Sequence, residues 1–253
     1  MDATSRRILG LISEMNVRYV VPVYQRPYSW DTEQCERLLE DIVTCGRKRN
    51  LAHFTGSIVT IQDGSLSRQG VAPLLLIDGQ QRIATINLLL VALARYDRKH
   101  PGWAHSFSLD EIARGGFVTN PYRTGDDYYK LTLSKDDRPT LHSLVRNLID
   151  ENEPIDKSSR RLLDNLAYFE RRLEDVDSID DVWAGLQRLE VVSISLAQGQ
   201  DQPQVIFESM NSTGKDLGSA DLVRNFVLMS YDIDEQDDVY RVYWSPIERT
   251  LGT

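Results

Sequence analysis

The chain has 253 residues, of which 41% are hydrophobic, and its formal net charge is -9. This size and composition allow a substantial buried core, which excludes disorder over most of the length. No stretch approaches the roughly 18 to 20 apolar residues of a membrane span, and polar residues follow Met1 where a secretory signal would be apolar. The acidic charge opposes nonspecific binding to nucleic acid, so any DNA contact must be local. We therefore expect a soluble, cytoplasmic protein.

Cysteine and histidine spacing bears on metal chemistry. Cys35 and Cys45 fall in one predicted helix, too far apart along it to form a disulfide. The four histidines lack the paired spacing of a zinc site. We expect a reduced protein whose metal, if it binds one, is an oxygen-ligated Mg²⁺.

Hydrophobic periodicity predicts alternating helices and strands in the first hundred residues. The expected elements are a helix over 8–15, a strand over 18–24, a helix after an Asp31/Gln34 capping box, strands over 54–62 and 74–77, and a helix over 79–99. The pattern then turns mainly helical, with its clearest apolar stripe over 162–173 and a short strand over 128–133. We divide the chain into an α/β nucleotide-binding core over 1–100 and a helical subdomain over 101–190. Residues 191–253 complete the core.

The last segment is predicted to hold a strand over 191–196, a short helix over 202–210, a polar loop over 211–218 and a helix from Ser219. The apolar side chains of that last helix are expected to face the core: Leu222, Val223, Phe226 and Val227. Its polar side chains are expected to point elsewhere: Asp221, Arg224 and Asn225. Apolar residues over 238–251 have little following chain to cover them, so we expect a longer protein, with a homo-oligomer as the alternative.

The most informative motif is Asp78-Gly79-Gln80-Gln81-Arg82, which reads as a tight turn between a strand and a helix. Free amides at a helix start favour anions, and Arg82 adds a forked positive charge. Asp78 is a candidate Mg²⁺ ligand, and Gln80 or Gln81 is a candidate to orient a water for attack on a phosphoryl group. The alternative is that Asp78 only caps the helix and Arg82 pairs with a surface carboxylate.

A second polar loop precedes the helix from Ser219. Its candidate nucleotide contacts are Asn211, Ser212, Thr213, Gly214 and Lys215, with Arg224 and Asn225 one turn into the helix. The alternative is a capped helix with a tight turn and no ligand.

A cluster of aromatic, amide and proline residues spans 24–30. Gln25 and Arg26 are candidates for nucleotide contacts, and the rings of the cluster suit stacking on a base. The alternative is that Tyr28 and Trp30 are core residues.

Five separated blocks occur in one order: residues 22–30, 54–59, 77–82, 207–214 and 217–225. Together they resemble the N-terminal domain of the GmrSD-type modification-dependent restriction family. The resemblance covers nearly the whole chain. The Asp-Gly-Gln-Gln-Arg block is similar to the phosphate-binding corner of ParB and sulfiredoxin-like domains.

The resemblance implies a ParB/sulfiredoxin-like α/β fold, a mixed-sheet core with a helical extension. It implies a GTPase-like NTP hydrolysis on residues 78–82, with GTP and Mg²⁺ as the first expectation. It also implies an antiphage restriction enzyme whose C-terminal HNH nuclease domain, expected outside this chain, cleaves modified DNA.

The modification implied is glucosylated hydroxymethylcytosine or, in the SspE-like branch, phosphorothioate. For phosphorothioate, Tyr24, Pro27 and Tyr28 are the candidate contacts with the weakly hydrated sulfur. Two alternatives remain: a nucleotide-independent DNA-binding module with a ParB-like phosphate corner, and a purely structural scaffold.

Overall fold

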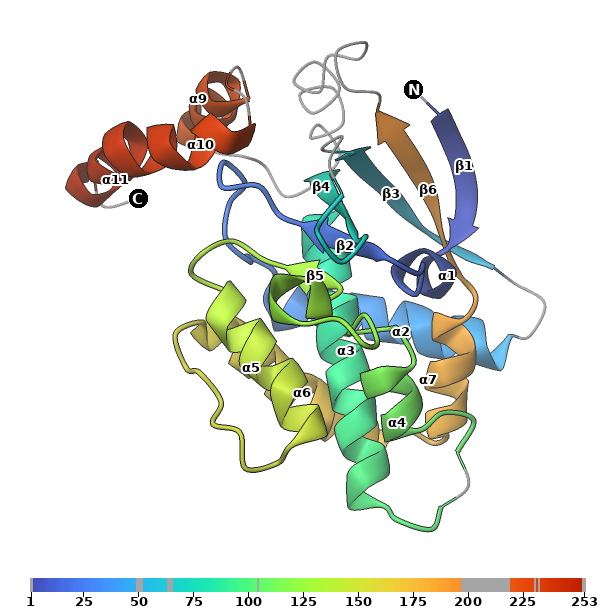
Figure 1. Ribbon diagram of the computed structural model, residues 1–253. Coiled ribbons are helices and arrows are strands. Elements are labelled where there is room, and N and C mark those ends of the chain that lie inside the picture. Colours follow the sequence, from blue (N-terminus) through green and yellow to red (C-terminus); the bar gives the residue numbers. More distant parts are fainter. Residues whose placement is uncertain are drawn as a thin grey trace.

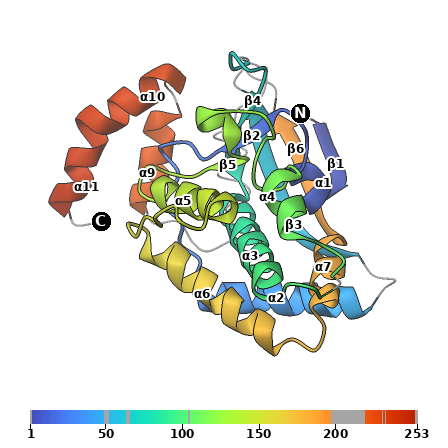
Figure 2. The same cartoon turned by 60° about the horizontal axis from the view of Figure 1, so that its bottom comes forward.

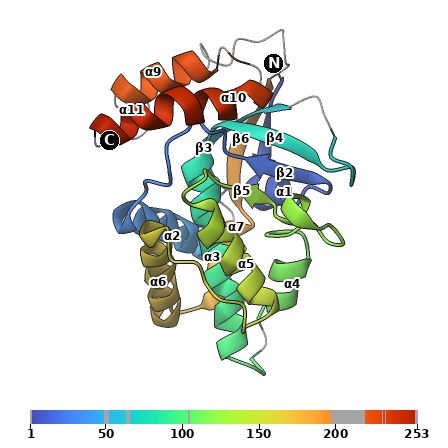
Figure 3. The same cartoon turned by 60° about the vertical axis from the view of Figure 1, so that its left-hand side comes forward.

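The computed structural model describes residues 2–48, 52–62, 66–103, 105–196, 219–229, 231 and 233–251. Its centre is a mixed sheet of six strands in the order β1-β6-β3-β4-β2-β5 (Figure 1). The helices of the middle of the chain gather on one side of this sheet (Figures 1 and 3). The described part therefore has the predicted α/β class with a mixed sheet.

The strands are β1 Asp2–Arg7, β2 Val17–Val20, β3 His53–Gln62, β4 Ala72–Asp78, β5 Leu131–Thr132 and β6 Leu189–Leu196. β6 runs antiparallel to β1 and parallel to β3, and β4 runs antiparallel to β3 and parallel to β2. The short β5 forms the edge, parallel to β2. A late segment of the chain, β6, thus lies inside the sheet.

Two predicted strands were too long, and one strand was not predicted. β2 ends at Val20 rather than Tyr24, because Pro22 lacks the N–H that a further ladder bond would need. β5 spans two residues, since Gly125–Tyr128 forms a 3₁₀ turn (η1) just before it. β1 is a polar, exposed edge strand and carries no alternating apolar pattern.

The helices are α1 Ile8–Ile12, α2 Thr32–Arg47, α3 Gln80–Lys99, α4 Leu109–Arg114, α5 Arg138–Ile149, α6 Arg160–Asp175, α7 Ile179–Leu186, α9 Ser219–Leu228, α10 Ile233–Val239 and α11 Ser245–Leu251. A π-helical turn, η3 Tyr240–Trp244, joins α10 to α11. The predicted capping box of α2 is confirmed: Asp31 accepts from the Glu33 N–H (3.1 Å), and Gln34 accepts from the Asp31 N–H (2.9 Å).

Helix α3 is the axis of the helical layer. Its residues from Ile83 to Ala94 are buried on every side, which is the pattern of a helix enclosed by other elements rather than one lying at a surface. Helices α4, α5 and α6 contact it, and β4 leads directly into its first turn (Figure 1). The start of α3 is therefore fixed from both the sheet and the helices.

The orientation predicted for α9 is wrong. Leu222, Val223 and Phe226 are 42%, 52% and 57% exposed, whereas Arg224 and Asn225 are buried. The polar side chains face inward because they meet the backbone carbonyl of Tyr24, a polar partner that periodicity alone does not reveal. Helices α9, α10 and α11 form an arm at one side of the molecule (Figures 1 and 2).

The two cysteines form no disulfide, as predicted, and both are buried. Within the described part of the chain, no helix combines the length and hydropathy that crossing a bilayer requires.

One buried histidine links α5 to the edge of the sheet. The ring of His142 stacks on Tyr129 with centroids 3.5 Å apart, and its Nε2 lies 3.3 Å from the Leu131 carbonyl oxygen. Burial lowers the pKa of His142 from 6.5 to about 4, and the nearby Arg138 and Arg146 favour the neutral ring further.

Replacing His142 with Gln should make the free energy of unfolding depend less on pH between pH 7 and 4. The unfolded chain takes up a proton near pH 6.5 and the folded chain only near pH 4, so the stability from the neutral ring is present above pH 6.5 and lost as the pH falls to 4. Urea unfolding should show the wild type losing up to roughly 3 kcal/mol more than the variant between pH 7 and 4. Parallel profiles would contradict the account.

Candidate functional site at the start of helix α3

The turn between β4 and α3 requires a glycine. Gly79 has φ +89° and occupies the position before the first helical residue. A Cβ at Gly79 would lie 2.9 Å from the Ser57 carbonyl oxygen and 3.0 Å from the Ile58 Cγ1. The left-handed backbone and this close approach to β3 both exclude a side chain, so the first amides of α3 lie directly beside β3.

Asp78 and Arg82 flank this turn and share Ser57. The Ser57 hydroxyl donates to Asp78 Oδ2 (3.0 Å), and Arg82 Nη1 donates to the Ser57 carbonyl oxygen (2.7 Å). Gly56 makes room for Arg82, since a Cβ there would lie 2.6 Å from Nη2. In the predicted alternative, Asp78 caps the helix and Arg82 pairs with a surface carboxylate. In the described part of the structure, no side chain caps α3, and both residues hydrogen-bond to Ser57 instead.

The Arg82 guanidinium is half-buried and charged. Burial lowers its pKa and the nearby Asp78 carboxylate opposes that effect, but an arginine in a protein stays protonated. The Arg82 side chain has five N–H donors. Among the described residues, only the Ser57 carbonyl accepts a hydrogen bond from it. Arg82 therefore keeps capacity for an anionic ligand.

The side chains of Gln80 and Gln81 bind residues 24–30, which we call the 24–30 loop. Gln81 Oε1 accepts from the backbone N–H of Ser29 (2.7 Å) and of Trp30 (3.3 Å), and its Nε2 donates to the Pro27 carbonyl (3.3 Å). Gln80 Nε2 donates to Gln25 Oε1 (3.0 Å). The amide of Gln81 is thus committed to holding the loop.

Gln25 hydrogen-bonds to residues on both sides of the turn. It is buried, and its Nε2 donates to the Ile77 carbonyl (3.0 Å), one residue before Asp78. Through its Oε1 it also accepts from Gln80. Gln25, predicted as a nucleotide contact, therefore bridges the residues before and after the turn.

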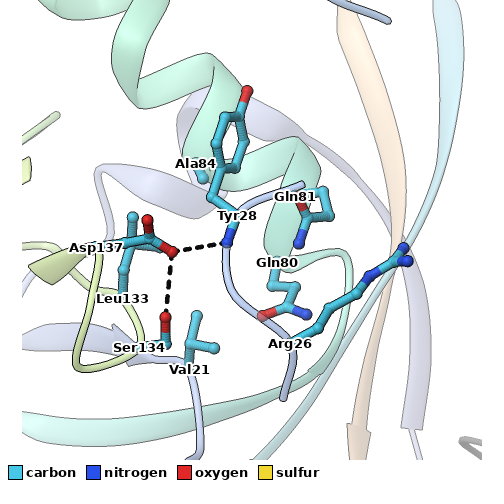
Figure 4. A pocket seen from close by; sticks show the side chains of 9 residues that line it. All are labelled: Val21, Arg26, Tyr28, Gln80, Gln81, Ala84, Leu133, Ser134 and Asp137. Atoms are coloured by element: carbon cyan, nitrogen blue, oxygen red, sulfur yellow. Dashed lines mark hydrogen bonds between the residues drawn. The ribbon is translucent and has the colours of Figure 1, made fainter. Parts of the chain in front are cut away.

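A buried carboxylate that the sequence analysis missed holds the loop from α5. Asp137 accepts from the Tyr28 N–H (2.6 Å) and the Ser134 hydroxyl (3.1 Å) (Figure 4). It also accepts from the Ser159 hydroxyl (2.6 Å). Its position just before Arg138 and Pro139, a typical helix start, was the available signal.

The aromatic side chains of the loop are packing residues in this conformation. Tyr24 and Tyr28 are buried, and the Tyr28 hydroxyl is hydrogen-bonded to Thr85 (2.7 Å) and Asn165 (3.0 Å). The core alternative for Tyr28 and Trp30 is confirmed, since Tyr28 belongs to the core and Trp30 packs on it. A DNA contact by Tyr24 or Tyr28 would require the loop to open, whereas Pro27 is exposed.

The remaining predicted nucleotide contacts divide into two groups. Arg224 is occupied by protein, because its Nε donates to the Tyr24 carbonyl (2.8 Å) and its Nη atoms contact Asp221 and Glu248. Asn225 also donates to the Tyr24 carbonyl once its amide is oriented to satisfy its partners.

Arg26 is half-buried near Asp221, and burial lowers its pKa. Asn211, Ser212, Thr213, Gly214 and Lys215 lie outside the described residues.

A small pocket of about 170 Å³, partly open to solvent, adjoins the turn. It is lined by Val21, Arg26, Tyr28, Gln80, Gln81, Ala84, Leu133, Ser134 and Asp137 (Figure 4). Much of this volume is open to solvent, and its enclosed part has no room for a water molecule. In the described part of the chain, the pocket is therefore a shallow hollow beside the turn and does not enclose a nucleotide.

The sequence matches the family model described as "GmrSD restriction endonuclease, N-terminal domain" over residues 8–228. This chain belongs to the GmrSD restriction endonuclease family. No curated protein matched the sequence. The match to the GmrSD N-terminal domain takes in the turn, the 24–30 loop and α9, and it ends before α10.

Asp78 is the residue of this GmrSD domain that we predicted to bind Mg²⁺. Among the described residues, no group of three or more histidine, cysteine, aspartate or glutamate side chains could hold a metal. Mg²⁺ at a phosphate site commonly uses one or two carboxylates together with phosphate oxygens and waters. A single half-buried carboxylate fits that requirement and does not fit a metal held by protein alone.

The GmrSD turn can be tested with two glycines that share a left-handed backbone. Gly79→Ala should destabilise the fold more than Gly102→Ala, because Gly102 has φ +87° but no neighbouring atom within 4 Å of an added Cβ. Strain alone should cost about 1–2 kcal/mol at Gly102, with an additional cost at Gly79 from the contact with Ser57. Equal losses in urea unfolding would show that the turn does not press against β3.

Proposed function

We propose that this domain hydrolyses nucleoside triphosphates, GTP first, with Mg²⁺, and that hydrolysis controls cleavage of modified DNA by the restriction enzyme. The observation that carries the proposal is the half-buried Arg82 guanidinium beside the first amides of α3, one turn from the Asp78 carboxylate. Membership in a restriction endonuclease family supports DNA as the eventual substrate.

Phosphate binding follows from the helix start and from Arg82. The first N–H groups of a helix have no partner within it, and they lie at the positive end of the helix dipole. Gly79 brings these amides close to β3, and Arg82 adds donors that match phosphate oxygens in pairs. An anion at this position would interact with both sets of donors.

Hydrolysis needs charge stabilisation and an oriented water more than covalent chemistry. Arg82 would offset the negative charge on the transferred phosphoryl group. Both glutamines line the pocket, but Gln80 is better placed than Gln81 to orient the water, because only the Gln80 Oε1 has no hydrogen bond within the described residues. Asp78 would hold Mg²⁺, which supplies positive charge to the phosphate oxygens.

The proposal leaves the nucleoside and the DNA modification open to experiment. Arg26 and residues 211–215 stay predicted contacts for the rest of the nucleotide. Tyr24, Pro27 and Tyr28 stay predicted contacts for a phosphorothioate sulfur, with an opening of the 24–30 loop as the required step. A link between that opening and the turn is provided by Gln80 and Gln81.

Phosphate release from GTP, UTP, CTP and ATP with Mg²⁺ tests the proposal. Asp78→Asn and Arg82→Ala should each lower kcat by about a hundredfold or more, the usual effect of removing a charge-stabilising group. The matched controls Asp110→Asn and Arg37→Ala remove side chains that are 73% and 71% exposed, and they should leave the rate unchanged.

Phosphorothioate or glucosylated DNA should raise the wild-type rate, and the DNA that does so names the modification. Folded wild-type protein that neither binds nor hydrolyses any of the four nucleotides would contradict the proposal. Salt-sensitive DNA binding without any nucleotide effect would instead support the DNA-binding alternative.

A further inference from the structure

Glu248 on α11 lies at the centre of three donors. Its Oε1 accepts from Arg224 Nη1 (2.6 Å) and Trp244 Nε1 (2.9 Å), and its Oε2 accepts from the Tyr240 hydroxyl (2.8 Å). The Glu248 side chain is only 21% exposed, and that of Arg224 is 8% exposed. Bonds to a shielded carboxylate are stronger than bonds between exposed groups, so this cluster fixes α11 against α9.

The π-helical turn η3 aligns this cluster. In a regular α-helix, residues eight apart diverge by about 80° around the axis, so Tyr240 and Glu248 would point in different directions. Five residues, Tyr240 to Trp244, adopt the wider π form, which takes more residues per turn and reduces this drift. Such turns are rare and are found frequently at functional sites.

Arg224 connects the cluster to the 24–30 loop. Its Nη1 binds Glu248, its Nη2 binds Asp221 Oδ1 (2.6 Å), and its Nε donates to the Tyr24 carbonyl (2.8 Å). All three nitrogens of the guanidinium therefore have protein partners, and the planar group holds them in a fixed relation. A substitution that moves Glu248 would therefore shift Arg224 and, through it, the Tyr24 carbonyl.

Two further hydrogen bonds, both made by Gln25, connect the 24–30 loop to residues 77 and 80, and so to residues 78–82, which we call the phosphate turn. Tyr24 is followed by Gln25, which donates to the Ile77 carbonyl and accepts from Gln80. Ile77 precedes Asp78, and Gln80 is the first residue of α3. The position of Glu248 is thus linked to both sides of the Asp78–Arg82 turn.

We propose that Glu248 and Arg224 are positioning residues for the phosphate turn, and that they couple it to the end of the arm, which consists of α10, η3 and α11. The proposal rests on the function proposed above. It assigns Arg224 to the arm rather than to the nucleotide. It also gives a role to residues 233–251, which lie beyond the matched family range.

The first test compares Glu248→Gln with Asp238→Asn in nucleotide hydrolysis. Glu248→Gln keeps the side-chain shape but removes the charge, and it should lower kcat about tenfold with KM changed less than about twofold. Asp238→Asn removes an exposed ion pair with Arg241 on the same arm and should have no effect. Wild-type kcat in folded Glu248→Gln would overturn the proposal.

A second readout needs no hydrolysis. In ¹⁵N NMR spectra without ligand, the amide resonances of residues 77–82 should differ from wild type in Glu248→Gln and match it in Asp238→Asn. Unchanged resonances would overturn the coupling even if the protein hydrolyses nucleotides. Shifted resonances in a protein without hydrolysis would keep the coupling and reject the proposed function.

Arg224→Lys provides a milder variant should Glu248→Gln fail to fold. Lysine keeps the positive charge but cannot bind Glu248, Asp221 and Tyr24 together. It should shift the same resonances and lower kcat in the same direction. Wild-type spectra and kcat in this variant would also overturn the proposal.

Discussion

The 24–30 loop depends on side chains from four helices for its backbone hydrogen bonds, and the site depends on that loop. Gln81 from α3 binds two of its N–H groups and one carbonyl, and Asp137 at the start of α5 binds a third N–H. α6 and α9 contribute bonds to its carbonyls from Asn165 and Arg224. Buried backbone groups are costly without partners, so segments distant in the sequence must assemble together for this loop to form.

This arrangement separates two uses of the Asp-Gly-Gln-Gln-Arg motif. Both glutamine side chains hold the 24–30 loop, whereas those of Asp78 and Arg82 hydrogen-bond only to Ser57 among the described residues. Under the proposed function, the motif therefore both holds the loop and binds phosphate. The conformation of the loop would therefore affect ligand binding at the turn, because Gln80 and Gln81 connect the two.

The sequence predicted the parts of the fold that local patterns encode. Periodicity predicted α3, and the Asp31 capping box predicted the start of α2. The turn followed from Asp-Gly between two apolar runs. By contrast, polar β1 joins the sheet only through pairing with β6, and Asp137 finds its partners across the fold. α9 faces inward with its polar side because the loop offers a carbonyl there, which no helical pattern can show.

Backbone amide shifts on titration with GTP and Mg²⁺ test the central claim most directly. The account predicts that the largest ¹⁵N and ¹H changes fall on Gly79, Gln80, Gln81 and Arg82. It also predicts that Arg82→Ala weakens the apparent affinity while leaving the rest of the spectrum folded. Saturable binding that leaves these four amides unmoved, with changes confined to another surface, would contradict the placement of the phosphate site.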